Sequence, residues 1–260
     1  MPELNIDGEV ISYDERGQGR NLVLVHGFPL DRRIWEDQVA GLSDVCRVIT
    51  VDLPGFGKST MKNAFTIPSL ADTLHKFLGR INALPCILGG LSMGGYVAFA
   101  CLTKYLPDLS GLLLVDTKCE ADTAEGKAAR LRMAEIARTK GSKAIADEME
   151  PKMLAPDADP RVRQKLRRIM EDCPPKTIET ALMAMRDRDD YRDKLPSVAV
   201  PTLIIVGEKD VLIPQSLCNS MCHEMPRCEM AVIRDAGHMA PMEKPAEVTA
   251  AIRRWLANVQ

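Results

Sequence analysis

Short hydrophobic runs alternate along this chain with segments whose apolar residues recur at helical spacing. Five runs are of the continuous type expected for strands buried on both faces of a parallel sheet, and a sixth, the last along the chain, is a weaker copy. They cover residues 22–26, 47–51, 86–89, 112–115, 202–206 and 229–233. The helical segments lie near residues 35–42, 69–78, 96–105, 214–221 and 246–259. This alternation predicts an α/β fold, in which helices cover both faces of a mostly parallel sheet.

The N-terminal residues predict a β-hairpin instead. Residues 4–6 and 9–13 have the character of strands. Asp7-Gly8 stands between them, and this dipeptide tolerates the positive φ angles of a two-residue turn. The sheet should therefore begin with an antiparallel pair.

A long internal segment, residues 119–194, contains no convincing strand. Its pattern is charged and helical, as at 124–139 and 160–170, and five prolines divide it into pieces, at positions 151, 156, 160, 174 and 175. The mixed signs of its charges favour a solvated helical surface over a charged binding face. We expect a helical cap at 119–194, inserted between two parts of one α/β core, residues 1–118 and 195–260.

Composition narrows the class of protein. The 260 residues include 34 Lys or Arg and 36 Asp or Glu, so the formal net charge is −2 and no basic field attracts nucleic acid or an anionic membrane. The longest apolar runs are far shorter than the ~20 residues of a membrane span. The first residues lack the pattern of a secretory signal. We therefore expect a cytoplasmic protein whose eight cysteines are reduced thiols.

Gly90-Leu91-Ser92-Met93-Gly94 fits the pattern G-x-S-x-G. The pattern occurs often by chance, but here it directly follows a predicted strand and directly precedes a predicted helix. A strand that turns sharply into a helix needs small flanking residues, because a Cβ atom would collide with the neighbouring backbone. The serine hydroxyl then projects at the N-terminal end of the helix. Ser92 is therefore the candidate nucleophile.

A serine is a poor nucleophile without a base, and histidine is the usual one. In this strand–turn–helix context the base follows the serine and an acid along the chain. Only His238 has that order and also follows a predicted strand. We interpret the other three histidines as a brace for the turn at residue 27 (His26), a surface or packing residue (His75) and a helix residue (His223).

Three carboxylates are candidates for the acid that orients the histidine. Asp210 lies in a loop just past the predicted strand 202–206 and is favoured, because open α/β sheets assemble their sites at the carboxyl edge. Asp116 follows the strand 112–115 and is a competitor. Glu208 is two residues from Asp210 and is a weaker one.

Acyl transfer also develops a negative oxygen that needs fixed hydrogen-bond donors, worth ~3 kcal/mol each. One donor should be the backbone N–H of Met93, the residue after the nucleophile. The other should come from the loop after residue 26, where Pro29 has no N–H and Phe28 is the natural donor. We expect the side chains of Phe28, Met93 and Met239 to line an apolar substrate pocket.

Four motifs in order resemble those of the α/β-hydrolase superfamily: residues 26–29 (HGFP), 52–59 (DLPGFGKS), 90–95 (GLSMGG) and 237–238 (GH). The chain is most similar to small bacterial carboxylesterases and enol-lactonase-like hydrolases. This resemblance covers nearly the whole chain and implies an eight-stranded type of sheet, a helical cap at 119–194, and an acyl-enzyme mechanism without a cofactor. In that mechanism Ser92 attacks the carbonyl, His238 moves the proton, and Asp210 holds the imidazolium.

Alternatives to ester or lactone hydrolysis remain at this stage. Serine at position 92 argues against dehalogenases and epoxide hydrolases, which carry aspartate there, but not against cofactor-free haloperoxidases, C–C hydrolases or a binding protein on this fold. Cys218, Cys222, His223 and Cys228 cluster locally, but their spacing matches no common zinc pattern, so we expect no metal. The expected partner is a small ester or lactone. The sequence does not reveal the oligomeric state.

Overall fold

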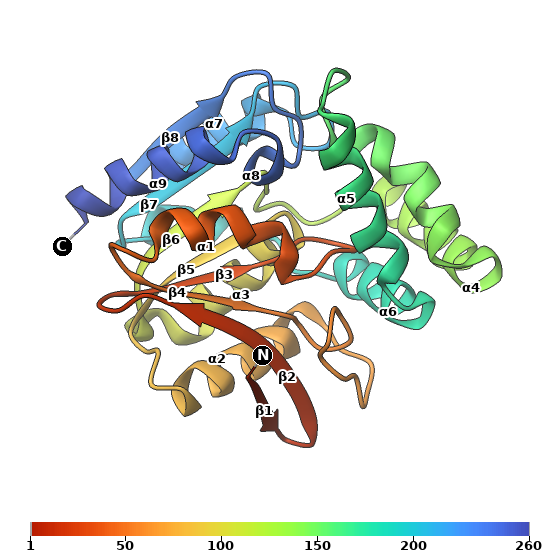
Figure 1. The fold of residues 1–260 in the computed structure, drawn as a ribbon, viewed down its shortest axis with the longest axis horizontal. Coiled ribbons are helices and arrows are strands. Elements are labelled where there is room, and N and C mark those ends of the chain that lie inside the picture. Colours follow the sequence, from red (N-terminus) through yellow and green to blue (C-terminus); the bar gives the residue numbers. More distant parts are fainter. Residues whose placement is uncertain (1, 260) are drawn as a thin grey trace.

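The computed structural model describes residues 2–259, which contain one eight-stranded sheet (Figure 1). Its spatial order is β1-β2-β4-β3-β5-β6-β7-β8. β2 pairs antiparallel with β1 and β4, and every later pair is parallel. The strands are β1 (Glu3–Ile6), β2 (Glu9–Arg16), β3 (Asn21–Val25), β4 (Arg47–Val51), β5 (Cys86–Leu91), β6 (Leu109–Val115), β7 (Thr202–Gly207) and β8 (Cys228–Ile233). The predicted parallel sheet and N-terminal hairpin are confirmed, and Asp7 and Gly8 in the turn have φ of 54° and 92°.

Each face of the sheet carries its own hydrophobic core. Side chains alternate along β3, so that Val23 and Val25 belong to one core and Leu22 and Leu24 to the other. The helices α2 (Ile67–Arg80), α3 (Met93–Tyr105) and α7 (Gln215–Glu224) contribute to the first core. The helices α1 (Glu36–Leu42), α8 (Ala240–Glu243) and α9 (Pro245–Asn258) contribute to the second. Burial of both faces explains the apolar runs of the inner parallel strands, whereas the edge strand β8 is half-buried or exposed at all but its last residue.

Between β6 and β7 the described chain forms only helices: α4 (Ala124–Met153), α5 (Pro160–Asp172), α6 (Pro175–Arg186) and the short 3₁₀ segment η3 (Arg192–Ser197). In Figure 1 the three α-helices, drawn in green, stand beside the sheet. The expectation that Pro151 divides this segment is wrong, because α4 continues through it to Met153. The interruption lies at Gly141, whose φ of 78° only glycine adopts readily. A proline in the last helical turn removes a single backbone bond, which the helix end tolerates.

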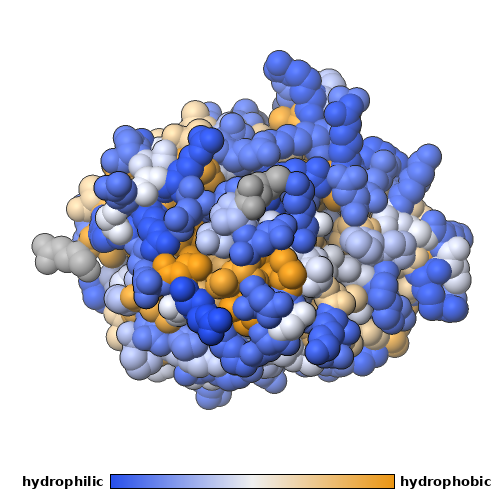
Figure 2. Space-filling model, turned by 60° about the horizontal axis from the view of Figure 1, so that its bottom comes forward, coloured by the Kyte–Doolittle hydropathy of each residue, from blue (hydrophilic) through white to orange (hydrophobic). Residues whose placement is uncertain are grey.

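The surface agrees with the charge balance of the sequence. The face shown in Figure 2 is mostly hydrophilic, with a compact hydrophobic area near its centre. Within residues 2–259 no helix has both the length and the apolar character to cross a membrane. Two further 3₁₀ segments, η1 (Arg32–Trp35) and η2 (Leu106–Asp108), complete the elements.

Candidate active site

Ser92 occupies a strained turn between β5 and α3, with φ of 51° and ψ of −111°. Few residues other than glycine adopt a positive φ, and such strain is typical of functional turns. The glycines on its helical side are required by space. A Cβ atom at Gly94 would lie 2.4 Å from the carbonyl oxygen of Val25, and one at Gly95 would lie 2.3 Å from Oγ1 of Thr117. The pattern G-x-S-x-G therefore reflects the close approach of α3 to two neighbouring strand ends.

Hydrogen bonds hold the Ser92 backbone in this position. Its N–H donates to the carbonyl oxygen of Val115 at 3.0 Å, and its carbonyl oxygen accepts from the Thr117 hydroxyl at 2.8 Å. On the other side, a Cβ atom at Gly27 would lie 3.3 Å from Cβ of Ser92. Ser92 therefore lies between the chain that follows β6 and the loop that follows β3.

His238 and Asp210 form a buried pair at the carboxyl ends of β8 and β7. Nδ1 of His238 and Oδ2 of Asp210 are 2.7 Å apart, and their side chains are 3% and 0% exposed. The other oxygen of Asp210, Oδ1, accepts the backbone N–H groups of Leu212 at 2.7 Å and Ile213 at 3.0 Å. A carboxylate that accepts from Nδ1 fixes the imidazole tautomer, with the proton on Nδ1 and the lone pair on Nε2.

The two competing carboxylates have different surroundings. Oε2 of Glu208 accepts the backbone N–H of Asp235, and Glu208 is exposed, so the structure does not bring it to His238. Asp116, in contrast, is fully buried beside the pair: ligand atoms of Asp116, Asp210 and His238 all lie within 4.8 Å of one another. Burial, followed by the negative charge of Asp210, raises the pKa of Asp116 well above its ordinary value.

These three residues are a poor zinc site despite their closeness. Two ligands that are each ~2.1 Å from one tetrahedral zinc ion stand roughly 3.4 Å apart. The 2.7 Å separation between His238 and Asp210 is instead that of a charge-assisted hydrogen bond. The geometry of this pair fits proton transfer better than metal binding.

The cysteine cluster after β7 contains a disulfide. Cys222, near the end of α7, is bonded to Cys228 at the start of β8, with their Cα atoms 5.4 Å apart. The expectation that all eight cysteines are free is therefore wrong for these two; the other six are free and buried. The bond forms because α7 and β8 are successive packed elements with a short connection, a proximity that composition does not reveal. Cys218 is buried and its Sγ faces the carbonyl oxygen of Thr117, so the described residues hold no zinc set here.

The loop after β3 is braced by His26, as predicted. Nε2 of His26 accepts the N–H of Leu53 at 3.1 Å, which places the ring proton on Nδ1, 2.8 Å from the carbonyl oxygen of Gly27. Burial lowers the pKa of His26, so the ring is neutral. Among residues 2–259 the N–H groups of Phe28 and Met93 donate to no protein acceptor. Both amides are therefore available to a bound molecule.

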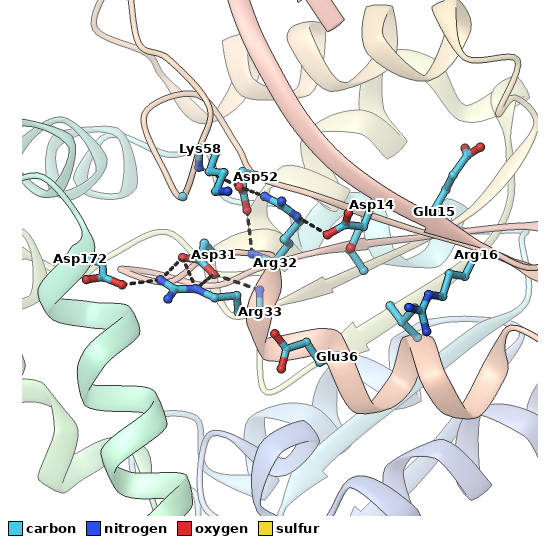
Figure 3. Close-up of a pocket in the computed structure, with 13 residues that line it drawn as sticks. Asp14, Glu15, Arg16, Asp31, Arg32, Arg33, Glu36, Asp52, Lys58 and Asp172 are labelled. Atoms are coloured by element: carbon cyan, nitrogen blue, oxygen red, sulfur yellow. Dashed lines mark hydrogen bonds and ion pairs between the residues drawn. The ribbon is translucent and has the colours of Figure 1, made fainter. Parts of the chain in front are cut away.

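A polar cavity of about 760 Å³ lies on the outer side of this loop, as Figure 3 shows. The Arg32 side chain bridges Asp14 and Asp52, and the Arg33 guanidinium bonds both Asp31 and Asp172. The residues that line the cavity do not include Ser92, Asp210 or His238. Its ion pairs tie the loop to β2, to the chain after β4 and to α5, so we interpret it as a support of the site.

The three predicted pocket residues are all buried in the structure. Phe28 is 4% exposed, and Met93 and Met239 are 0% exposed. Phe28 and Met93 belong to one core and Met239 to the other, so they pack on both faces of the sheet.

Sequence reasoning missed Glu243. Its two carboxylate oxygens accept the N–H of Gly237 at 2.9 Å and the N–H of Ala155 at 2.8 Å. The carboxylate therefore joins the residue before His238 to the segment between α4 and α5. The only signal in the sequence is a carboxylate five residues after His238.

Comparison with known proteins shows the same architecture. A solved thermophilic esterase from Thermogutta terrifontis has a TM-score of 0.96 and 38% identity, over 100% of this chain and 99% of that chain. A solved enol-lactonase from Burkholderia xenovorans LB400 shares the fold with a TM-score of 0.91 at 24% identity, over 98% and 100% of the two chains. A pimeloyl-[acyl-carrier protein] methyl ester esterase from Vibrio cholerae is 29% identical over 240 residues, 89% of this chain and 91% of the relative.

The family assignment rests on a match to nearly the whole chain. The sequence model of the alpha/beta hydrolase family matches residues 22–252, which include β3 except its first residue, the strands β4 to β8 and every candidate site residue. This chain belongs to the alpha/beta hydrolase family.

Proposed function

We propose that this protein is a serine hydrolase that cleaves small carboxylic esters or lactones through an acyl-enzyme on Ser92. The observation that carries the proposal is the buried hydrogen bond between His238 and Asp210 at one edge of the sheet, above which Ser92 also stands. An oriented histidine that reaches a serine in such a turn is the arrangement that activates a hydroxyl for attack, and Ser92 is only half-buried. No cofactor takes part in this proposal.

The mechanism assigns one role to each group. Nε2 of His238 takes the proton of the Ser92 hydroxyl as the oxygen attacks the carbonyl carbon, and Asp210 stabilises the resulting imidazolium. The N–H groups of Phe28 and Met93 donate to the oxyanion, and their freedom from other acceptors supports this role. The imidazolium then protonates the leaving oxygen, and water, deprotonated by the same histidine, releases the acid and frees Ser92.

The choice of substrate class rests on the site and on relatives. Phe28, Met93 and Met239 are buried and uncharged, so these residues place no fixed charge near the proposed site, which suits a small uncharged acyl group. The esterase from Thermogutta terrifontis and the methyl ester esterase from Vibrio cholerae support ester cleavage. We further propose that residues 119–194 act as the cap over this site, because Ala155 is bonded through Glu243 to the loop that carries His238.

Covalent labelling tests the proposal. A fluorophosphonate reacts only with an activated serine, so peptide mass spectrometry should find the label on Ser92 in the wild type and no label in Ser92→Ala. The matched control is Ser220→Ala, which changes an exposed serine on α7 and should label normally. The labelled protein should lose hydrolysis of short p-nitrophenyl esters and lactones. A folded wild type that takes no label would refute the mechanism.

A further inference from the structure

Asp116 is a buried carboxyl group that the mechanism does not use. It follows β6 directly, is 0% exposed and has a φ of 44°. Its Oδ1 atom accepts the backbone N–H of Gly207 at 2.8 Å. Its Oδ2 atom is buried and receives no hydrogen bond from any described residue, although the Asp210 carboxylate stands beside it. A buried carboxylate oxygen without a donor is costly, whereas a protonated one becomes a donor itself.

Two carboxyl groups this close in a buried site cannot both ionise, so they hold one proton between them. The distribution of donors decides which group holds it. Asp210 accepts three N–H groups, from His238, Leu212 and Ile213, and each favours its charged form. Asp116 accepts only one. The charge therefore resides on Asp210 and the proton on Asp116.

We propose that Asp116 is a protonated positioning residue, whose Oδ2–H donates to the Asp210 carboxylate and completes the hydrogen bonds that hold it against His238. This inference rests on the proposed function, because Asp210 needs fixing for catalysis only where His238 is the base. It extends the site to a second carboxyl group, which touches neither substrate nor reacting atoms.

The surroundings of Asp116 support the protonated form. Glu243 from α8 adds a further negative charge, and the Cys218 thiol of α7 is held neutral because burial raises its pKa to about 12. His238 is neutral at rest in the proposed mechanism. Within residues 2–259, none of the largest electrostatic influences on Asp116 comes from a cation that would offset a second negative charge. Keeping the proton on Asp116 leaves Asp210 as the one counter-ion when the imidazolium forms.

The first experiment detects the proposed proton on Asp116 by infrared spectroscopy. Infrared difference spectra of the wild type and Asp116→Asn at neutral pH should show the C=O band of a protonated carboxyl group in the wild type, and the variant should lack it. Glu243→Gln is the matched control, because Glu243 carries another carboxyl group, which is half-buried. The spectrum of this variant should retain the band. A wild type without this band, or a band that only Glu243→Gln removes, would overturn the proposal.

The second test compares two substitutions at the same position. Asparagine keeps an acceptor for Gly207 and an N–H donor for Asp210, and it tolerates a positive φ, so kcat should stay within about threefold of the wild type. Asp116→Gly suits the same backbone but removes the donor, so kcat should fall about ten- to hundredfold. Thermal melts establish that both variants fold. Equal losses in the two variants would contradict a donor role.

Failure of this inference can be separated from failure of the proposed function. If Ser92 takes no fluorophosphonate but the infrared band depends on Asp116, the hydrolase mechanism fails and the shared proton stands. If Ser92 is labelled and the band is absent, the mechanism stands and Asp116 is not the protonated partner.

Discussion

Nδ1 of His238 lies 2.7 Å from Oδ2 of Asp210, and both side chains are shielded from solvent. This hydrogen bond stabilises both groups. The carboxylate selects the tautomer of the imidazole, and the Nδ1 proton satisfies a buried, negatively charged oxygen of Asp210. Two backbone N–H groups hold the other carboxylate oxygen, so Asp210 cannot rotate away. The relationship leads directly to a kinetic prediction.

Asp210→Asn should lower kcat about 10³–10⁴-fold, with a small effect on KM. The amide keeps the shape but removes the charge that stabilises the imidazolium, and its NH₂ group favours the wrong tautomer of His238. Steady-state kinetics with a p-nitrophenyl ester would measure both constants. Asp157→Asn, which changes an exposed aspartate, should leave them unchanged. A loss of less than tenfold in Asp210→Asn would assign the orienting acid elsewhere.

Gly94→Ala should destabilise the fold by about 1–3 kcal/mol and impair activity, because its Cβ would lie 2.4 Å from a backbone oxygen of β3 that cannot move aside. Gly79→Ala in α2 is the matched control. Its Cβ would meet nothing nearer than 4.0 Å, so this variant should be neutral or gain up to about 1 kcal/mol. Thermal melts and Ser92 labelling of both variants would check the pair; similar Tm values would show that space does not select glycine at position 94.

The sequence predicted the parallel strands, the turn at Ser92 and the positions of Asp210 and His238, because a local pattern of residues indicates each of them. The parallel strands could be recognised because burial on both faces favours apolar residues at successive positions. The turn at Ser92 could be recognised because a Cβ atom at Gly90, Gly94 or Gly95 would collide with neighbouring atoms. Asp210 and His238 followed from their positions past strand ends. Asp116 was weighed only as a competing acid, because a sequence does not show how many N–H groups each carboxyl group receives.

The features that the sequence did not predict depend on how separate segments pack together, which no local pattern of residues indicates. Glu243 matters because the chain between α4 and α5 packs against Gly237. Its hydrogen bond to Ala155 joins residues that are 88 positions apart. The pairing of Cys222 with Cys228 depends on how α7 turns into β8. The course of α4 through Pro151 depends on the position of this proline in the last helical turn, which the sequence pattern does not locate.

The stability of the wild type relative to Asp116→Asn should fall as pH rises. Burial and the charge of Asp210 raise the pKa of Asp116 in the fold, whereas in the unfolded chain the group titrates near ~3.9. Between those two pKa values the unfolded chain releases a proton that the fold retains. The free energy of unfolding of the wild type, relative to that of Asp116→Asn, should therefore decline by about 1.4 kcal/mol per pH unit until the pH reaches the pKa of Asp116 in the fold.

Urea unfolding of both proteins at pH 5.5 and about pH 7.5 measures this difference. The raised pKa of Glu243 is common to both proteins and cancels in the comparison. A difference that does not change with pH would mean that Asp116 is ionised in the fold.

Removing the disulfide should affect stability more than catalysis. The bond between Cys222 and Cys228 closes a short loop, with a sequence separation of 6, and constrains the unfolded chain by about 2 kcal/mol. The double variant Cys222→Ser, Cys228→Ser should therefore melt lower but still label at Ser92. A reductant should lower the Tm of the wild type and leave that of the variant unchanged. A reductant effect on both proteins would place the sensitive thiols elsewhere.

Glu243→Gln should weaken the link between the segment that joins α4 to α5 and the loop that carries His238. The carboxylate accepts one N–H with each oxygen, from Gly237 and from Ala155, whereas glutamine offers one oxygen and turns an NH₂ group towards the other N–H. The unpaired donors should cost about 1–3 kcal/mol of stability. Because Gly237 precedes His238, kcat should fall as well. Glu247→Gln, an exposed change on α9, should alter neither quantity. An unchanged Tm and kcat in Glu243→Gln would show that packing of the Leu154–Ala155 backbone against Gly237, and not the carboxylate, holds these two segments together.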